Sequence, residues 1–313
     1  MSTTTDVAPF PLSMDETGPH AGVVVLRLEQ AGSPVVVLDH PLIQRIEATL
    51  RILPKTMKGF VLASASAKVF VAGADLKTIQ ANPADPDADR KLDAYLAYGQ
   101  RVFGMIAELP VPTAAAISGA ALGGGLELAM HCDALIGAPN ASGKPYPIGL
   151  PEAGLSICPG WGGTNLFPAR IDPADAIRRT AIGKPMTYDE AVAAKMFDLV
   201  ATSEAELLAT AKGWVVGARA KMGQPGGIPK RDGAPSRWIG RPITKSAVLA
   251  ALARIGDEKL ETESARAVLD EVRAGLDRGW QSALDLERRE LTRLRNTPAG
   301  RAAIQAFFDK SRK

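Results

Sequence analysis

The sequence predicts an α/β fold, and the order of its apolar segments carries that prediction. Short runs rich in Val, Ile and Leu, typical of buried strands, alternate with longer segments whose apolar residues recur at helical spacing. Clusters of Gly, Pro and Ser separate these segments and mark turns. With 46% hydrophobic and 23% charged residues over 313 positions, the chain can bury a large core without disulfides or metal ions. Such alternation is the pattern of α/β architecture.

The first half of the chain supplies most of this alternation. Residues 22–28 and 34–38 are β-branched runs separated by a turn, which predicts two strands. Residues 41–53 follow with apolar positions at helical spacing. The other elements predicted in this half are a strand at 60–64, a helix at 87–108 ended by Pro110 and Pro112, a strand at 113–118, a helix at about 124–131 and a strand at 133–137.

The second half changes character after residue 173. Two short helices, at 172–183 and 187–197, precede a long loop at 223–243 that is rich in Gly, Pro and Arg. From residue 244 the chain is helical and charged, so its apolar stripe must pack on the core or on a neighbouring subunit. We therefore divide the chain into a flexible N-terminal tail (1–20), a core with the active site (21–215) and a loop plus helical C-terminal region (216–313).

The composition excludes several classes of protein. A formal net charge of +3 is too small to indicate a nucleic acid partner. No stretch approaches the roughly 18 uninterrupted apolar residues of a membrane span, so no membrane partner is expected. The N-terminus lacks the basic start of a signal peptide, and the two isolated cysteines, Cys132 and Cys158, lie in apolar segments. These features predict a cytoplasmic protein with inert, reduced thiols.

The most informative stretch is A-A-L-G-G-G-L-E-L-A-M-H-C-D at residues 120–133, where three glycines precede Glu127 in apolar company. A dinucleotide-binding turn is disfavoured, because Glu127 in the first helical turn would repel a pyrophosphate. A tight strand-to-helix turn is one alternative. In the functional alternative, bare N–H groups at the helix start point at a ligand oxygen that gains negative charge, and glycine lets that ligand approach.

A metal site is a further reading of the same stretch. Glu127 and His131 stand one helical turn apart and could be two ligands. However, the chain has only three histidines, and neither His20 nor His40 has a neighbouring cluster of ligands. The sequence therefore predicts no metal, and it predicts that His131 is a partly buried polar residue.

Two further motifs place unusual residues after strands. In F-V-A-G-A-D-L-K at residues 70–77, Asp75 would cap a helix, while the N–H of Ala74 would offer a second donor to the same ligand oxygen. In I-G-L-P-E-A-G-L-S-I-C-P-G-W-G-G-T at residues 148–164, Glu152 is the sole charge. Because burial raises the pKa of a carboxyl toward neutral pH, Glu127 and Glu152 are candidates for an acid/base pair.

Together these three motifs resemble the crotonase (enoyl-CoA hydratase/isomerase) superfamily. The resemblance extends from about residue 22 to the C-terminus and is strongest over residues 58–77 and 111–170. Two segments, K-G-F-V-L-A-S-A-S-A-K-V-F-V-A-G-A-D-L-K and I-G-L-P-E, resemble in particular the hydratase part of bacterial fatty-acid-oxidation multienzymes. The resemblance implies a crotonase-like spiral of ββα turns with a helical C-terminal trimerisation region, and trimers that commonly pair into hexamers.

The resemblance also implies roles for individual residues. The backbone N–H groups of Ala74 and Gly124 would form an oxyanion hole for the thioester oxygen of an acyl-CoA. Glu127 would hold and deprotonate the water that adds to C3, and Glu152 would share this water and protonate C2. No cofactor is implied, because coenzyme A is part of the substrate. The substrate- and CoA-binding residues implied by the motifs are Ala72, Asp75, Leu76, Lys77, Gly123, Phe308 and Lys310.

The chain departs from the family pattern at two places. The gap of 25 residues between Glu127 and Glu152 is longer than usual, and the extra residues, 140–147, are predicted at the mouth of the site, where they would affect acyl-chain specificity. Lys195 replaces the family's glycine, which we interpret as a structural detail. No G-x-G-x-x-G βαβ unit is present, so NAD chemistry is not expected.

The expected function is that of an enoyl-CoA hydratase, which adds water in syn fashion across the double bond of 2-trans-enoyl-CoA in fatty acid β-oxidation. Isomerisation, hydrolysis, decarboxylation or carbon–carbon cleavage of an acyl-CoA on the same fold is the alternative. A non-catalytic or RNA-binding relative is a third hypothesis. The two glutamates argue against isomerases that use a single acid.

Overall fold

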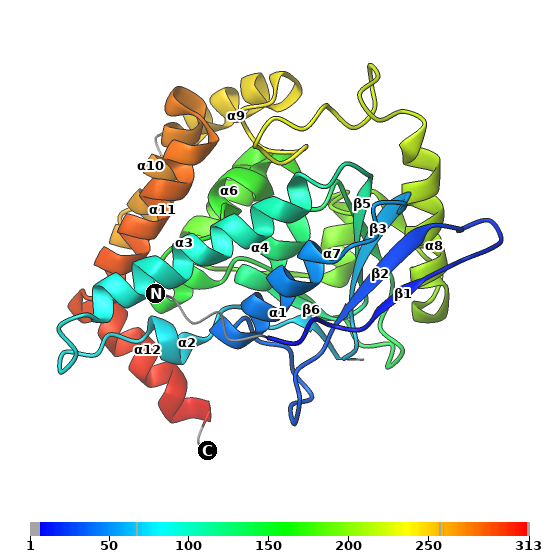
Figure 1. The fold of residues 1–313 in the computed structure, drawn as a ribbon. Coiled ribbons are helices and arrows are strands. Elements are labelled where there is room, and N and C mark those ends of the chain that lie inside the picture. The colour runs from blue at the N-terminus through cyan, green and yellow to red at the C-terminus, as the bar shows by residue number, and fades with distance from the viewer. Residues whose placement is uncertain (1–6, 67, 257, 259, 312–313) are drawn as a thin grey trace.

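Two β-sheets form the frame of the computed structural model, which describes residues 7–66, 68–256, 258 and 260–311 (Figure 1). The larger sheet has the strand order β1-β2-β3-β5-β7-β10, and the smaller sheet has the order β4-β6-β8-β9. The strands are β1 (Leu12–Met14), β2 (Val23–Leu28), β3 (Gly59–Ser64), β4 (Val69–Val71), β5 (Thr113–Ile117), β6 (Ala120–Leu122), β7 (Ala134–Gly137), β8 (Pro147–Gly149), β9 (Met186–Thr187) and β10 (Leu199–Val200).

From β3 to β8 the strands alternate between the two sheets, and helices lie where the chain returns from the smaller sheet to the larger one. β3 in the larger sheet is followed by β4 in the smaller one, then β5 by β6 and β7 by β8. The helices are α1 (His40–Arg51), α2 (Leu76–Ile79), α3 (Ala88–Ala107), α4 (Gly124–Met130), α5 (Gly163–Leu166), α6 (Pro173–Ile182), α7 (Tyr188–Ala193), α8 (Glu204–Arg219), α9 (Pro242–Ile255), α10 (Glu263–Arg278), α11 (Trp280–Arg295) and α12 (Pro298–Ser311), with 3₁₀ turns η1 (Glu152–Leu155) and η2 (Phe167–Ala169).

Helices cover both faces of the larger sheet, whose pairs are parallel except for β1 with β2. α8 packs on one face against β3 and β5, and α1, α3 and α4 lie on the other side (Figure 1). The strands are therefore apolar on both faces, as sheets of this kind require. The α8 side is built from Leu207, Ala211 and Val215 on Val61 and Ala114. This arrangement confirms the α/β class.

Most of the predicted elements in the first half are confirmed, and one is wrong. Helices appear at the predicted positions 41–53, 87–108 and 124–131 as α1, α3 and α4. Residues 34–38, however, form no strand, and Leu38 makes only an isolated bridge to Ala74. Only Val36 and Leu38 of this run are buried, where their backbone groups bond to Ala72 and Gly73 after β4, so the run lies beside a turn and does not pair as a strand.

The N-terminal segment differs from the predicted flexible tail. Residues 1–6 lie outside the described part of the chain. Beyond them, Phe10 is buried and its backbone N–H donates to Thr49 Oγ1 at 2.8 Å, and β1 pairs antiparallel with β2. This part of the tail therefore belongs to the core. At the other predicted boundary, α8 continues past residue 215, so the division there falls within a helix.

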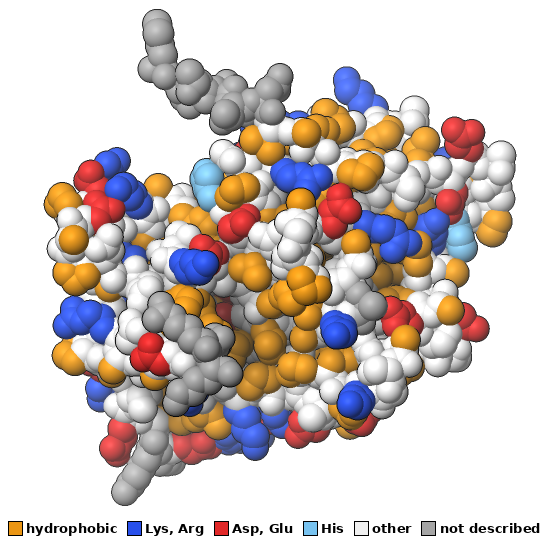
Figure 2. All heavy atoms as spheres, turned by 90° about the horizontal axis from the view of Figure 1, so that it is seen from below, with side chains coloured by type: hydrophobic (Ala, Val, Ile, Leu, Met, Phe, Trp, Pro, Cys, Tyr) orange, Lys and Arg blue, Asp and Glu red, His pale blue; other side chains and the backbone are white. Residues whose placement is uncertain are grey.

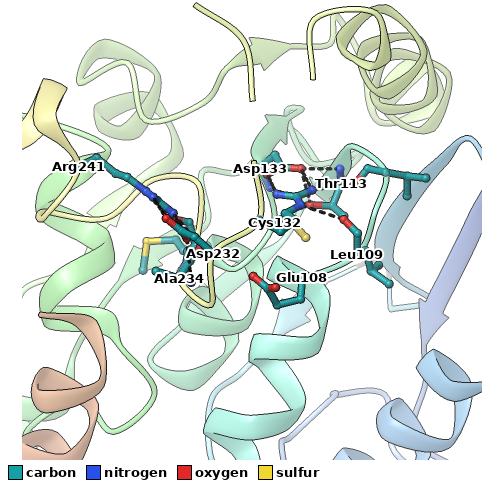
Figure 3. Close-up of polar contacts among 12 residues, drawn as sticks. Glu108, Leu109, Thr113, Cys132, Asp133, Asp232, Ala234 and Arg241 are labelled. Carbon is teal, nitrogen blue, oxygen red and sulfur yellow. Dashed lines mark hydrogen bonds and ion pairs between the residues drawn. The ribbon is translucent and has the colours of Figure 1, made fainter. Parts of the chain in front are cut away.

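The long loop before α9 is present as predicted and is fastened to the core by arginines. Arg231 forms a largely buried ion pair with Asp133 at 2.7 Å. It also donates to the carbonyl oxygens of Leu109 and Val111. Figure 3 shows Asp133 beside Thr113, whose N–H and hydroxyl both donate to this aspartate. A buried charge pair with several hydrogen bonds gives a loop of irregular backbone a defined position.

The C-terminal helices pack on the core of their own chain. α10 lies against α5 and α6, and α11 lies against α3 (Figure 1). α12 contacts η1, the turn that begins with Glu152. The predicted charged helical region thus buries much of its apolar surface within one subunit, although Ile243, Leu249 and Phe307 stay exposed.

Candidate active site

The predicted site residues follow the C-terminal ends of three parallel strands of the smaller sheet. Ala74 comes after β4, Gly124 after β6 and Glu152 after β8. The register pairs Val71 with Ala121 and Leu122 with Gly149, so these three ends lie side by side. The structure therefore brings together three motifs that are separated by up to 78 residues in the sequence (152 − 74).

The glycine triplet is packed on every side, which explains its composition. Gly123 has a φ of +51°, and a Cβ placed on it would lie 2.4 Å from Glu152 Oε1. A Cβ on Gly124 would lie 2.3 Å from the Trp161 ring, and one on Gly125 would lie 2.3 Å from a backbone oxygen of β4. No other residue fits at these positions. The triplet is thus a tight turn, and it also brings Glu152 against the start of α4.

The backbone N–H groups of Ala74 and Gly124 take no part in the backbone hydrogen bonds that their neighbours make. Leu38 donates to the carbonyl oxygen of Gly73 and accepts from the N–H of Asp75, which turns the N–H of Ala74 away from that segment. Gly124 is the first residue of α4, where an N–H group has no acceptor within the helix. In the described part of the chain, neither N–H is a donor in the backbone hydrogen bonds of turns and loops. Both therefore suit an external acceptor.

Glu127 is a buried carboxylate held by backbone amides. Its side chain is 1% exposed, and its Oε1 accepts hydrogen bonds from the N–H of Trp161 at 2.7 Å and of Gly163 at 2.8 Å. Burial raises the pKa of Glu127 well above its usual value, and the charges of Glu287 and Glu152 raise the pKa further. The two hydrogen bonds from these N–H groups lower the pKa of Glu127, because they favour its anion.

Glu152 lacks comparable support. The residue is partly exposed, but its Oε2 is buried and has no hydrogen-bond partner among the described residues. Burial raises the pKa of Glu152 to about 8, and the charge of Glu287 contributes. Since the charge of Glu152 in turn raises the pKa of Glu127, the two carboxyls titrate as a coupled pair. The hydrogen bonds distinguish the two carboxyls, because two N–H groups favour the anion of Glu127, whereas Oε2 of Glu152 has no such donor among the described residues.

Two further buried glutamates in this region were missed by sequence reasoning. Glu287 on α11 and Glu271 on α10 are both fully buried. Burial raises the pKa of Glu287 to about 7 and that of Glu271 well above its usual value. In the sequence, Glu287 stands in the charged run L-D-L-E-R-R-E-L, where nothing distinguishes it from the exposed charges around it. Only its position at the predicted buried stripe of the helix could have singled it out.

His131 is more deeply buried than the partly buried residue that the sequence predicts. It is 1% exposed, and its Nδ1 lies 2.9 Å from the carbonyl oxygen of Glu127. Burial lowers the pKa of His131 to about 4, so the ring is neutral at physiological pH. Over the described ranges, no group of three or more His, Cys, Asp and Glu side chains is arranged to hold a metal ion. The two cysteines are free and buried.

The residues predicted around the CoA moiety begin next to the oxyanion turn. Asp75 caps α2, because its side chain accepts from the N–H of Lys77 at 3.1 Å and from the Thr78 hydroxyl at 2.8 Å. The predicted capped helix is therefore confirmed. Ala72 and Leu76 are partly buried, whereas the side chain of Lys77 is exposed.

The two predicted C-terminal residues lie on α12. Phe308 packs against the main apolar core, and Lys310 is exposed. Since α12 contacts η1, the structure brings this helix to the turn that carries Glu152. Figure 2 shows the face on which α2 and α12 lie in Figure 1, where apolar side chains gather in the middle and charged side chains of both signs lie around them.

The prediction that residues 140–147 lie at the mouth of the site is wrong. This segment precedes β8, whereas Glu152 follows β8 at the other end of the strand. Asn140 Nδ2 donates to the carbonyl oxygen of Ser118 before β6, and the N–H of Ala141 donates to Glu204 on α8. The extra residues therefore lie at the start of β8, and the length of this strand separates them from Glu152 at its end.

The buried glutamates predict an unusual dependence of stability on pH. Glu152 and Glu287 have folded-state pKa values of about 8 and about 7, above the usual value of a glutamate. Their contribution to stability is present at low pH and is lost as the pH rises through these values, because unfolding releases their protons. We expect the urea midpoint to be lower at about pH 8.5 than at about pH 5.5, and Glu287→Gln to reduce this difference. An equal midpoint at both values would contradict the burial of these groups as acids.

The chain matches a known protein family over more than half of its length. A model of the family described as enoyl-CoA hydratase/isomerase matches residues 36–217. In the part of the chain that the structure describes, no helix is long and apolar enough to span a membrane.

Solved structures share the fold at low sequence identity. The human mitochondrial delta3-delta2-enoyl-CoA isomerase is similar with a TM-score of 0.64 and 19% identity, covering 93% of this chain and 94% of that one. An enoyl-CoA hydratase from Mycobacterium avium subsp. paratuberculosis K-10 has a TM-score of 0.60 and 19% identity, with 97% of each chain covered. One from Bacillus halodurans has a TM-score of 0.64 and 17% identity, covering 91% of this chain and 96% of that one.

Proposed function

Since the chain belongs to the enoyl-CoA hydratase/isomerase family, we propose that it adds water to the double bond of 2-trans-enoyl-CoA thioesters. The observation that carries this proposal is the pair of interacting carboxyls, Glu127 on α4 and Glu152 on η1, in the segments that follow the neighbouring strands β6 and β8. Hydration needs both an anionic carboxylate that accepts a proton from water and a neutral carboxyl that donates one to carbon. The differing environments of the two glutamates support this division.

The proposed reaction uses each group once. The thioester oxygen accepts hydrogen bonds from the N–H groups of Ala74 and Gly124, which stabilise the enolate by several kcal/mol. Glu127 takes a proton from the water as its oxygen bonds to C3, and Glu152 gives a proton to C2 on the same face. The proton on Glu127 then passes to Glu152, which restores the pair. Ala72, Gly123, Asp75, Leu76, Lys77, Phe308 and Lys310 line the path of the CoA moiety in this proposal.

A direct assay separates this proposal from its alternatives. The purified protein is given crotonyl-CoA, and loss of the enoyl thioester absorbance is followed together with the mass of the product. We expect a product heavier by one water. A shifted double bond from a 3-enoyl-CoA without hydration would indicate an isomerase, and release of free CoA would indicate a hydrolase. RNA retention without any acyl-CoA turnover would indicate a binding protein.

The proposed acid predicts an alkaline limit to activity. Glu152 has a pKa of about 8 and must be protonated to act on C2, so its contribution is present below this value and is lost above it. We expect kcat to fall about tenfold for each pH unit above the limit, measured with wild-type protein between about pH 6 and about pH 10. This fall of kcat at high pH should be absent from the residual activity of Glu152→Gln. A flat profile up to about pH 10 would remove Glu152 as the acid.

The proposed assembly is a homotrimer, or a hexamer formed from two trimers, as in the family. Several large apolar side chains outside the site are exposed in the single chain and are available for subunit contacts. The most exposed of them are Ile52, Ile182 and Ile243. The native mass measured by light scattering tests this part of the proposal.

A further inference from the structure

Four successive residues behind the proposed site donate their N–H groups to two different carboxylates. Trp161 and Gly163 donate to Glu127 Oε1, at 2.7 Å and 2.8 Å. Gly162 donates to Glu287 Oε2 at 2.6 Å, and the N–H of Thr164 donates to Glu287 Oε1 at 3.1 Å. The Thr164 hydroxyl donates to that same oxygen. The segment 161–164 is therefore held from both sides, with alternate N–H groups on opposite carboxylates.

The two carboxylates come from distant parts of the chain. Glu127 is on α4, and Glu287 is on α11 in the C-terminal helical region, with exposures of 1% and 0%. The segment between them is tightly packed, because a Cβ on Gly162 would lie 2.4 Å from the Trp280 ring. Moving Glu287 would therefore displace the same backbone whose N–H groups hold Glu127.

We propose that Glu287 is a positioning residue for the proposed hydration, which acts by fixing the segment 161–164 and through it the carboxylate of Glu127. This inference rests on the proposed function. Glu287 does not touch the substrate, so its effect is on the placement of the base and on kcat. A displacement of the order of 1 Å in an active site is enough for a large loss of rate.

The charges around Glu287 determine how a substitution affects the pH profile. The titratable groups facing Glu287 and Glu127 are Glu152 on η1, Glu271 on α10, Cys158 on the segment before α5, and Tyr95 on α3. Three donors point at Glu287, which favours its anion, whereas both carboxylate oxygens of Glu271 are buried without a partner in the described part of the chain. These hydrogen bonds therefore favour ionisation of Glu287 over that of Glu271.

Two variants with the same chemical change test the inference. In Glu287→Gln, the amide cannot accept from both sides of the segment, and the charge is lost. We expect kcat for crotonyl-CoA to fall about tenfold to 10²-fold with KM changed by less than about threefold. We also expect the fall of kcat/KM on the acid side of its pH profile to move to lower pH. The reason is that the charge of Glu287, which opposes ionisation of Glu127, is gone.

Glu271→Gln is the matched control. Glu271 is equally buried, but its side chain makes no hydrogen bond to residues 161–164 among those described. Its kcat is expected to stay within about twofold of wild type, with an unchanged acid side of the pH profile. Equal kinetics in the two variants would overturn the role of Glu287. Wild-type protein that hydrates no enoyl-CoA would instead overturn the proposed function.

A second pair of variants covers the case in which Glu287→Gln does not fold. Thr164→Val removes the hydroxyl that donates to Glu287 but keeps the backbone N–H, whereas Thr164→Ser keeps both donors. We expect Thr164→Val to lose several times more kcat than Thr164→Ser, with similar KM values. Equal kcat values in these two variants would show that the contact with Glu287 does not influence the base.

Discussion

Replacement of Glu127 by glutamine is expected to lower kcat for enoyl-CoA hydration by about 10³-fold, the range of a lost general base. Glutamine has the same shape and still presents an oxygen to the N–H groups of Trp161 and Gly163, so the fold should be retained. It cannot take a proton from water at neutral pH, and KM should therefore change little. The measurement is steady-state hydration of crotonyl-CoA, with the unfolding midpoint as a check on the fold.

The matched control is Glu29→Gln, a glutamate whose side chain is 54% exposed and lies 3.8 Å from the guanidinium of Arg45. It should keep kcat and KM within about twofold of wild type. If Glu127→Gln retained activity within about the same factor, Glu127 would not be the base and the proposed mechanism would fail.

Replacement of Trp161 by alanine is expected to have the largest effect on stability. The indole is 1% exposed and packs edge-on against Tyr95 and Phe103, with ring centroids 5.4 Å and 5.1 Å away. Its Nε1–H donates to the carbonyl oxygen of Leu96 at 3.0 Å. Removing a buried aromatic of this size leaves a cavity and costs about 3–5 kcal/mol of unfolding free energy. Urea denaturation followed by circular dichroism measures this loss.

Trp161→Phe separates packing from the indole hydrogen bond. The smaller ring keeps most of the apolar contact but loses the Nε1–H donor, so the cost should be about 1–2 kcal/mol, clearly below that of alanine. Because the backbone N–H of Trp161 still holds Glu127, folded protein of this variant should remain active. Alanine and phenylalanine variants with the wild-type urea midpoint would show that the ring is not part of the core in solution.

Local patterns predicted the elements that depend on nearby residues. The helical spacing at 87–108 predicted α3, and its expected buried residues Leu92, Tyr95 and Ile106 are buried. The run at 34–38 was misread because β-branched composition reports burial, while strand pairing depends on a partner elsewhere in the chain. Similarly, residues 140–147 were placed at the wrong end of β8, because spacing along the sequence does not give the direction of a strand.

The sequence also predicted a finer likeness, to the hydratase part of fatty-acid-oxidation multienzymes, which rests on residues 58–77 and on I-G-L-P-E. It stays a prediction, because structures at 17–19% identity share the fold alone. Activity with enoyl-CoAs of increasing chain length would test it.

By itself, the sequence determined the alternation of strands and helices, the three glycine-rich motifs and the presence of Glu127 and Glu152 in apolar surroundings. Each of these depends on residue types within a few positions of one another, where composition and spacing suffice. Only the tertiary structure decided that Gly124 packs on Trp161, that Glu152 lies against Gly123, and that Glu287, 160 positions after Glu127 (287 − 127), supports the same segment of backbone. These depend on contacts between distant segments, and a buried carboxyl takes its protonation and its role from the neighbours that folding brings to it.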